Sequence, residues 1–156
     1  MLDPHFETPE PVLSGETADI YFARTIEILK KVGLNPVATM EVFPSRAGIL
    51  CGMHEVHALL SKVLPPDREV WSLSEGEPFQ RKEVVLRITA SYQSYGLYET
   101  AICGILAQCS GWATAAKECV DAANGTPVIS FGARHVHPSV AGILDYAALV
   151  GGCSGC

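Results

Sequence analysis

Hydrophobic residues recur along the chain with two different periodicities. Apolar side chains spaced three and four residues apart predict helices, whereas alternation or a short apolar run predicts a strand. On this basis the predicted helices cover residues 14–33, 52–63, 98–124 and 138–152. The predicted strands cover residues 36–43, 47–51, 68–79 (with a glycine turn), 82–92 and 126–134. This mixture of helices and strands places the chain in the α/β class.

The first predicted helix has recognisable ends. Ser14 or Thr17 can cap its start, and Gly33 stops it just before an Asn-Pro pair. Residues 1–13 precede it and are rich in proline, so we expect them to form a flexible N-terminal arm. A mixed α/β domain that ends in a long helix is then expected over residues 14–125.

The longest predicted helix, residues 98–124, is rich in small side chains. A mid-helix glycine such as Gly111, directly after Ser110, costs about 1 kcal/mol relative to alanine. The Ser-Gly pair therefore indicates either close packing of a neighbouring backbone or a ligand at that turn. Cys109 shares the helix with Cys103 and Cys119, and we expect all three to be small core residues.

A cluster of polar residues follows the last predicted strand. The apolar run ends at Gly132, and Arg134, His135 and His137 come directly after it. Side chains at the carboxyl end of a buried parallel strand project into the ligand crevice of α/β proteins. The arginine offers a planar fork for a carboxylate or phosphate, and the histidines offer hydrogen bonds and a proton near neutral pH. These properties would suit the binding of a small anion.

Two other interpretations of this cluster stay open. The segment can be an ordinary strand-to-helix loop, with a salt-bridging arginine and histidines that cap the next helix. It can also hold zinc, if His135 and His137 join Cys153 and Cys156. The sequence alone does not decide among the three.

The amino-acid composition argues against several classes of protein. Of the 156 residues, 48% are hydrophobic and 18% are charged, which indicates a folded globular chain. The net charge of −6 and the absence of basic runs argue against a nucleic-acid surface. No apolar stretch reaches the roughly 18 residues of a membrane span, and the first residues do not form a signal peptide. The six cysteines are therefore predicted to be free thiols in a cytoplasmic protein.

Several segments together resemble one enzyme family. They are GETADIYFART (15–25), EGEPF (75–79), YETAICGILAQCSGWATAA (98–116) and ISFGARHVHPSVAGILDYAALVGGCSG (129–155). The family is the nicotinate phosphoribosyltransferases, in the branch close to quinolinate phosphoribosyltransferase. The resemblance implies an α+β N-terminal domain followed by the first strand and helix of an α/β barrel, here residues 126–156. It also implies an N-terminal fragment of a longer enzyme, which we expect to be unstable or to aggregate when produced alone.

The resemblance also implies a reaction and its participants. Family members join nicotinate to phosphoribosyl pyrophosphate, which gives nicotinate mononucleotide and pyrophosphate, with Mg²⁺ on the pyrophosphate and ATP as co-substrate. They work in the salvage of NAD and are expected to form homodimers.

By resemblance, individual residues of this chain receive roles. Arg134 corresponds to an anion-binding arginine, and His135 and His137 to its catalytic neighbours. Tyr21 corresponds to a tyrosine that stacks on nicotinate across a dimer interface, and Thr25 and Ser110 to supporting substrate-binding positions.

Three alternatives to this function remain. A quinolinate phosphoribosyltransferase needs more cations for the second carboxylate of its substrate, and one arginine with histidines favours nicotinate. A truncated, non-catalytic paralogue could dimerise with a full-length subunit. A small metal-binding protein would use the histidine and cysteine pairs.

Overall fold

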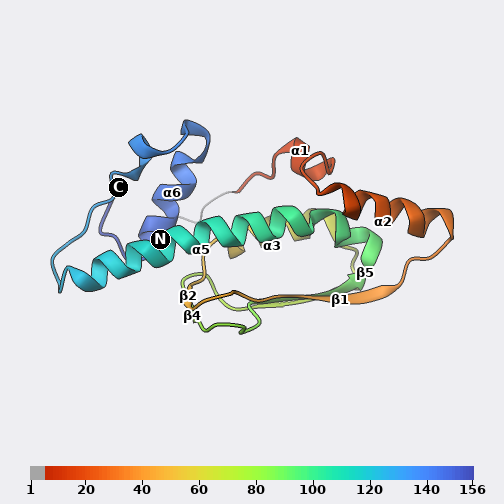
Figure 1. The fold of residues 1–156 in the computed structure, drawn as a ribbon, viewed down its shortest axis with the longest axis horizontal. Coiled ribbons are helices and arrows are strands. Elements are labelled where there is room, and N and C mark those ends of the chain that lie inside the picture. Colours follow the sequence, from red (N-terminus) through yellow and green to blue (C-terminus); the bar gives the residue numbers. More distant parts are fainter. Residues whose placement is uncertain (1–5) are drawn as a thin grey trace. The chain divides into compact units, whose positions relative to one another are not determined.

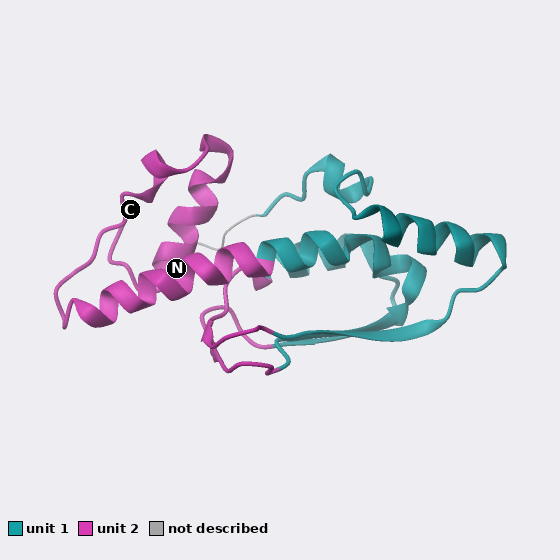
Figure 2. Cartoon of the chain, in the orientation of Figure 1, with its two compact units in different colours: residues 1–43, 54–72, 84–105 teal, residues 44–53, 73–83, 106–156 magenta. Residues whose placement is uncertain are grey.

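The computed structural model describes residues 6–156 and divides into two compact units. Unit 1 comprises residues 1–43, 54–72 and 84–105, and unit 2 comprises residues 44–53, 73–83 and 106–156 (Figure 2). The division cuts across the chain several times and passes through the longest helix. It therefore differs from the boundary near residue 125 that the sequence suggested.

Unit 1 is a three-stranded antiparallel sheet with helices along one face (Figure 1). The strand order is β1-β5-β3, and the strands are β1 (Val37–Val42), β5 (Leu86–Ser91) and β3 (Glu69–Ser72). The helices are α1 (Glu10–Leu13), α2 (Ile20–Lys31), α3 (Met53–Val63), α4 (Tyr92–Tyr95), the 3₁₀ turn η1 (Gly96–Tyr98) and the first part of α5 (Glu99–Ala122). The most deeply buried side chains of the unit include Val56, Leu59, Leu86, Ile88, Tyr95 and Ile102.

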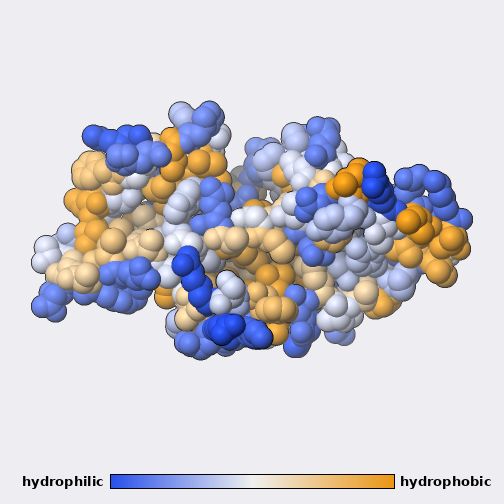
Figure 3. Space-filling model, viewed as in Figure 1, coloured by the Kyte–Doolittle hydropathy of each residue, from blue (hydrophilic) through white to orange (hydrophobic). Residues whose placement is uncertain are grey.

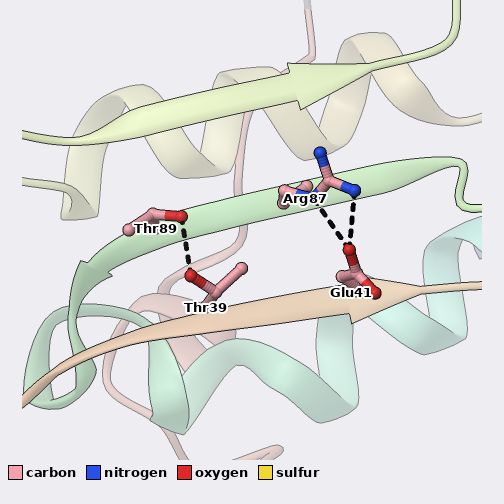
Figure 4. A network of polar contacts seen from close by, with 4 residues as sticks. All are labelled: Thr39, Glu41, Arg87 and Thr89. Carbon is pink, nitrogen blue, oxygen red and sulfur yellow. Dashed lines mark hydrogen bonds and ion pairs between the residues drawn. The ribbon is translucent and has the colours of Figure 1, made fainter.

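The alternating sequence of β5 explains the two faces of this sheet. Leu86, Ile88 and Ala90 are buried, whereas the residues between them point to the other face. There Arg87 lies opposite Glu41 of β1, with its Nε 2.8 Å from Oε1. Two residues away along each strand, the hydroxyls of Thr39 and Thr89 lie 2.9 Å apart. Figure 4 shows both contacts between β1 and β5.

Unit 2 combines a short pair of antiparallel strands, which are distant in sequence, with helices. Strand β2 (Gly48–Ile49) pairs antiparallel with β4 (Pro78–Phe79). The remainder of α5, the 3₁₀ turn η2 (Gly132–His135) and α6 (Pro138–Val150) complete the unit. Pro138 occupies the first turn of α6, where its missing N–H leaves no hydrogen bond unmade.

Most of the predicted elements are confirmed, with shorter bounds. Helices α2, α3, α5 and α6 and strands β1, β2, β3 and β5 lie inside the segments that the sequence indicated. The fold class, a mixture of helices and small antiparallel sheets, is also as predicted. Within the described part of the chain, no helix is both long and apolar enough to span a membrane.

The start of the first long helix was predicted wrongly. Helix α2 begins at Ile20, and its N-cap is Asp19 rather than Ser14 or Thr17. Gly15 lies between α1 and α2 and has φ +80°, a conformation that is not helical and so separates the two helices. A side chain at this position would overlap Leu97. Ser14 instead donates its hydroxyl to the carbonyl of Pro11.

Part of the predicted arm is structured. Residues 1–5 lie outside the described residues, but Glu10–Leu13 form α1. The Tyr98 hydroxyl donates to the carbonyl of Leu13 at 3.1 Å, and Thr8 is only 8% exposed. Residues 8–13 are therefore docked on unit 1 rather than forming a loose arm.

The buried strand expected over residues 126–134 is absent from the described structure. Only Ile129 pairs, in a single parallel bridge with Gly155, and residues 132–135 form η2 instead. Ile129 and Phe131 are 56% and 66% exposed. The apolar sequence is that of a central strand, but Gly155 is its one bridge partner among residues 6–156, so no ladder forms.

Helices α5 and α6 approach each other through a glycine. A methyl group on Gly151, at the end of α6, would overlap the carbonyl oxygen of Ala113 and lie 2.7 Å from the Cβ of Ala116. This contact accounts for part of the small-residue character of α5, because a larger residue would hold the end of α6 away.

The substitution Gly151→Ala is expected to destabilise the protein by about 1–3 kcal/mol through this overlap. The matched control is Gly142→Ala, in the middle of the same helix, because nothing lies within 4 Å of the added methyl group. There the better helix propensity of alanine should stabilise the protein by up to about 1 kcal/mol. Thermal or urea unfolding of both variants measures the difference, and equal effects would show that the close approach does not exist.

Candidate functional site

Arg134 lies over an aromatic ring. It lies on η2, and its guanidinium carbon is 5.6 Å from the centre of the Phe131 ring. Among residues 6–156, no ion pair involves Arg134, so the prediction of a salt-bridging arginine is wrong. A charged guanidinium that rests on a ring keeps its N–H donors for an anion.

His137 caps helix α6. Its Nδ1 accepts a hydrogen bond from the backbone N–H of Ser139 at 3.2 Å and lies 2.7 Å from the Ser139 hydroxyl. The prediction of a capping histidine is therefore confirmed for His137. This cap requires Nδ1 to be unprotonated, which leaves the other ring nitrogen, Nε2, to carry the proton. His135 ends the 3₁₀ turn one residue after Arg134, with its side chain exposed.

Tyr21 and Thr25 occupy successive turns of α2 in unit 1. The Tyr21 side chain is 57% exposed, and its ring centre lies 4.3 Å from that of Phe22. Thr25 donates its hydroxyl proton to the Tyr21 carbonyl at 2.8 Å. The exposed ring of Tyr21 is therefore available for stacking. The Thr25 hydroxyl, in contrast, is already bonded to the backbone of its own helix.

A polar link that the sequence did not reveal fixes the start of α2. The N–H of Asp19 donates to the Thr100 hydroxyl at 3.1 Å, and this hydroxyl donates to Asp19 Oδ2 at 3.0 Å. The Tyr21 hydroxyl reaches the same carboxylate oxygen at 3.4 Å. The two partners lie 81 residues apart in sequence, so no local pattern indicates their contact.

The carboxyl group of Glu99 lies close to Asp19, which changes its pKa. Partial burial raises the pKa of its carboxyl group, and the negative charge of Asp19 raises it further. Two carboxylates thus share a small region of unit 1 at the junction of α2 and α5.

Ser110 connects two backbones in unit 2. Its hydroxyl accepts from the Cys51 N–H at 3.1 Å and donates to the Cys51 carbonyl at 3.2 Å, and the residue is 8% exposed. One turn later, the Thr114 hydroxyl accepts from the Ile49 N–H at 2.9 Å. Ser110 therefore marks close packing of a neighbouring backbone, one of the two explanations that the sequence left open, whereas nothing lies within 4 Å of a methyl group added to Gly111.

A second polar group in unit 2 was not anticipated. Glu75 accepts from the Gly52 N–H at 2.7 Å, and the hydroxyl of Tyr146 also bonds to its side chain. A hydrogen bond with Cys109, together with burial, raises the pKa of the Cys51 thiol far above its usual value. Such thiols stay protonated at neutral pH and are poor nucleophiles.

The cysteines of α5 do not all lie in the core. Cys109 is buried as predicted, whereas Cys103 and Cys119 are exposed. Nowhere in residues 6–156 do three or more His, Cys, Asp or Glu side chains form a group able to hold a metal ion. The zinc interpretation of His135, His137, Cys153 and Cys156 therefore has no support in the described structure.

Comparison with known proteins defines the class. Residues 19–110 match the family described as quinolinate phosphoribosyl transferase, N-terminal domain. The nicotinate-nucleotide pyrophosphorylase from Pyrococcus furiosus is 38% identical over 99% of this chain, with a TM-score of 0.88. The chain therefore belongs to the quinolinate phosphoribosyl transferase family. It spans 41% of the length of the Pyrococcus protein.

More distant structures share the fold. The nicotinate-nucleotide pyrophosphorylase from Francisella tularensis is 14% identical over 99% of this chain, which covers 56% of that protein, with a TM-score of 0.71. Human nicotinic acid phosphoribosyltransferase is 19% identical over 88% of this chain, which covers 35% of that protein, with a TM-score of 0.74. The family match thus corrects the prediction in one respect: it supports the quinolinate branch rather than specifically the nicotinate branch.

The variant Ser110→Ala is expected to lower the unfolding free energy by about 1–3 kcal/mol, because the N–H and the carbonyl of Cys51 both lose their partner in a buried place. Ser61→Ala removes an exposed hydroxyl of α3 and should change stability by less than about 0.5 kcal/mol. Urea unfolding compares the two. If Ser110→Ala were as stable as the unchanged protein, the structural role would be contradicted. The expected role of Ser110 in substrate binding would then be the better explanation.

The variant Glu99→Gln is expected to raise the melting temperature at about pH 7 and to have little effect near pH 3. The raised pKa means that the folded state disfavours the ionised carboxylate, so stability falls as the pH rises from the unfolded pKa through the folded one. Gln is uncharged and does not incur this loss. Glu118→Gln, an exposed site on the same helix, is the control. A Glu99→Gln effect that does not depend on pH would refute the explanation.

Proposed function

We propose that this chain forms the N-terminal part of a phosphoribosyltransferase that acts on a pyridine carboxylate, with quinolinate as the preferred substrate. The observation that carries the proposal is the 38% identity to a nicotinate-nucleotide pyrophosphorylase along almost the whole chain. The family match over residues 19–110 supports the same substrate class. The chain covers less than half of that relative, so the activity belongs to the complete protein.

The proposed reaction converts quinolinate and phosphoribosyl pyrophosphate to a nicotinate nucleotide. The pyridine nitrogen attacks the anomeric carbon of phosphoribosyl pyrophosphate, a C–N bond forms, and the C–O bond to pyrophosphate breaks. Quinolinate has one carboxylate more than a nicotinate nucleotide, so the C–C bond to that carboxylate breaks, CO₂ leaves, and the ring carbon keeps the electron pair and takes up a proton. Positive charge develops on the ribose and negative charge on the leaving group, and cationic side chains stabilise the latter.

The residues of unit 2 that suit this chemistry are those of the polar cluster. In the proposal, Arg134 binds a carboxylate or phosphate with the N–H groups that its contact with Phe131 leaves available. His135 and the Nε2 of His137 supply further donors, because the cap of α6 occupies only Nδ1 of His137.

The residues of unit 1 have different parts in the proposal. The exposed ring of Tyr21 stacks on a pyridine, and Thr25 stabilises the turn of α2 that carries it. Ser110 supports the site only indirectly, because its hydroxyl is already bonded twice to Cys51.

Mg²⁺, ATP and a second subunit belong to the same proposal. The described residues offer no cluster of carboxylates for a metal, so Mg²⁺ would arrive on the pyrophosphate of the co-substrate. The use of ATP as a co-substrate and the formation of a homodimer, to which Tyr21 would contribute, remain predictions.

Nicotinate is the second candidate substrate. The polar cluster contains a single arginine, whereas the two carboxylates of quinolinate call for more cations. The shared fold of human nicotinic acid phosphoribosyltransferase is compatible with this alternative.

The test is a turnover assay on the complete protein with phosphoribosyl pyrophosphate and Mg²⁺, supplied with quinolinate or nicotinate, with and without ATP. We expect product and CO₂ from quinolinate, and a loss of about 100-fold or more in kcat/KM for Arg134→Ala. Arg81→Ala, an exposed arginine in unit 2, is the control and should retain full activity. Product from nicotinate alone would establish the second candidate, and no product from a folded protein would favour a non-catalytic paralogue.

A further inference from the structure

The turn that follows helix α5 contains the pair Asn124-Gly125. Both residues have a left-handed backbone conformation, with φ +47° and +88°. Asparagine and glycine adopt this conformation more readily than other residues, so the pair suits a tight turn at the end of a helix. A hydrogen bond from the N–H of Thr126 to the carbonyl of Ala123, at 3.0 Å, closes the turn around the pair.

Two groups of this pair are free to react with each other. Within residues 6–156, neither the side-chain amide of Asn124 nor the N–H of Gly125 takes part in a hydrogen bond. Both residues are exposed, and a methyl group added to Gly125 would meet nothing within 4 Å beyond its chain neighbours. Glycine also has no side chain of its own to shield the nitrogen. Water and a base therefore reach both groups.

We propose that Asn124 is a site of spontaneous covalent modification, in which its amide is converted to a carboxylate through a cyclic imide. The Gly125 nitrogen loses its proton to a base and attacks Cγ of Asn124, so that a C–N bond forms. The bond from Cγ to the side-chain nitrogen breaks, and this nitrogen takes up protons and leaves as ammonia. Because both partners belong to adjacent residues, the attack is intramolecular and closes a five-membered succinimide ring.

Water completes the reaction. It adds to one of the two carbonyl carbons of the succinimide and opens the ring, which gives aspartate from one carbon and isoaspartate from the other. The overall change consumes one water and releases one ammonia, so no oxidant, reductant or further reactant is needed. The proposal concerns the chain itself and does not rest on the proposed function.

The folded structure opposes ring closure only weakly. The Gly125 nitrogen reaches Cγ by rotation about the bonds of Asn124, and this rotation disrupts the hydrogen bond between Thr126 and Ala123. Loss of one exposed hydrogen bond slows a reaction by no more than about tenfold. We therefore expect Asn124 to react in the folded protein at a rate within about tenfold of that in an unfolded peptide.

The products would alter the end of helix α5. The helix ends at Ala122, and the negative end of its dipole faces the turn, so a new carboxylate just beyond it is unfavourable. Isoaspartate also adds a carbon atom to the main chain, which a turn closed by the Thr126–Ala123 bond cannot accommodate unchanged. The same turn leads from α5 to the segment that carries Arg134. We therefore expect the modified protein to melt at a lower temperature.

The chain contains an internal control, its other asparagine. Asn35 is followed by Pro36, whose nitrogen carries no hydrogen and cannot form a succinimide. The side chain of Asn35 is also held, because its Oδ1 accepts from the N–H of Gln93 at 3.2 Å. Both asparagines are present in every sample, so one experiment compares them under identical conditions.

The experiment incubates the folded full chain at mildly alkaline pH, beside a synthetic peptide of residues 120–130. Peptide mass spectrometry follows the conversion of each asparagine with time, and an isoaspartyl methyltransferase detects isoaspartate. We expect conversion at Asn124, with both aspartate and isoaspartate formed, and none at Asn35. Three results would each overturn the proposal: an intact Asn124 while the peptide reacts, equal conversion of Asn35, or aspartate without isoaspartate. Circular dichroism confirms that the chain stays folded.

Two variants separate the chemistry from its consequence. Asn124→Gln keeps an amide but would have to close a six-membered ring, so its conversion should be at least about tenfold slower. Asn124→Asp introduces the charge without the longer main chain. The melting temperature of the unchanged protein should fall with incubation time, below that of Asn124→Asp, whereas that of Asn124→Gln should stay at its own starting value. An equal fall with time in Asn124→Gln would show that the loss arises elsewhere and would overturn the proposed consequence.

Discussion

The approach of other backbones to helix α5 is the constraint on which most of the fold depends. In unit 2, Ser110 and Thr114 bond to the backbone at Cys51 and Ile49, and Gly151 brings the end of α6 onto Ala113. Such contacts need short side chains on α5, because longer ones would separate the backbones from the helix. Packing therefore requires short side chains at Ser110, Ala113 and Ala116, although serine has a lower helix propensity than alanine. It does not explain Gly111, because nothing lies within 4 Å of a methyl group added there.

Helix α5 also positions the exposed tyrosine of unit 1. Thr100, in its first turn, holds the N-cap of α2 and so fixes the position of the exposed Tyr21. Hydrophobic surface gathers at the end of the unit where α2 and β1 meet (Figure 3). Val32, Leu34 and Val37 there are all more than half exposed.

The sequence revealed the elements better than the contacts between them. Local periodicity was sufficient for α3, α5 and β5, since these elements bury one face of a regular repeat. It was insufficient for the start of α2, because the Asp19–Thr100 bond joins residues 81 positions apart. It also misjudged residues 126–134, which form a single β-bridge, to Gly155, within residues 6–156. At the candidate site, the sequence pattern identified Arg134 and the capping His137, whereas the hydrogen bond from the Gly52 N–H to Glu75 has no local sequence signal.

The two polar pairs on the outer face of β1 and β5 bear on how the protein folds. Their partners lie 46 and 50 residues apart in sequence, so the strands find each other only after a long loop has closed. A slip of one residue would bring the hydrophobic face of β5 into solvent, and a slip of two would place Arg87 opposite the wrong neighbour and separate Thr89 from Thr39. Glu41 and Thr39 thus help to fix the register of this long-range pairing, a role that their modest contribution to equilibrium stability would not reveal.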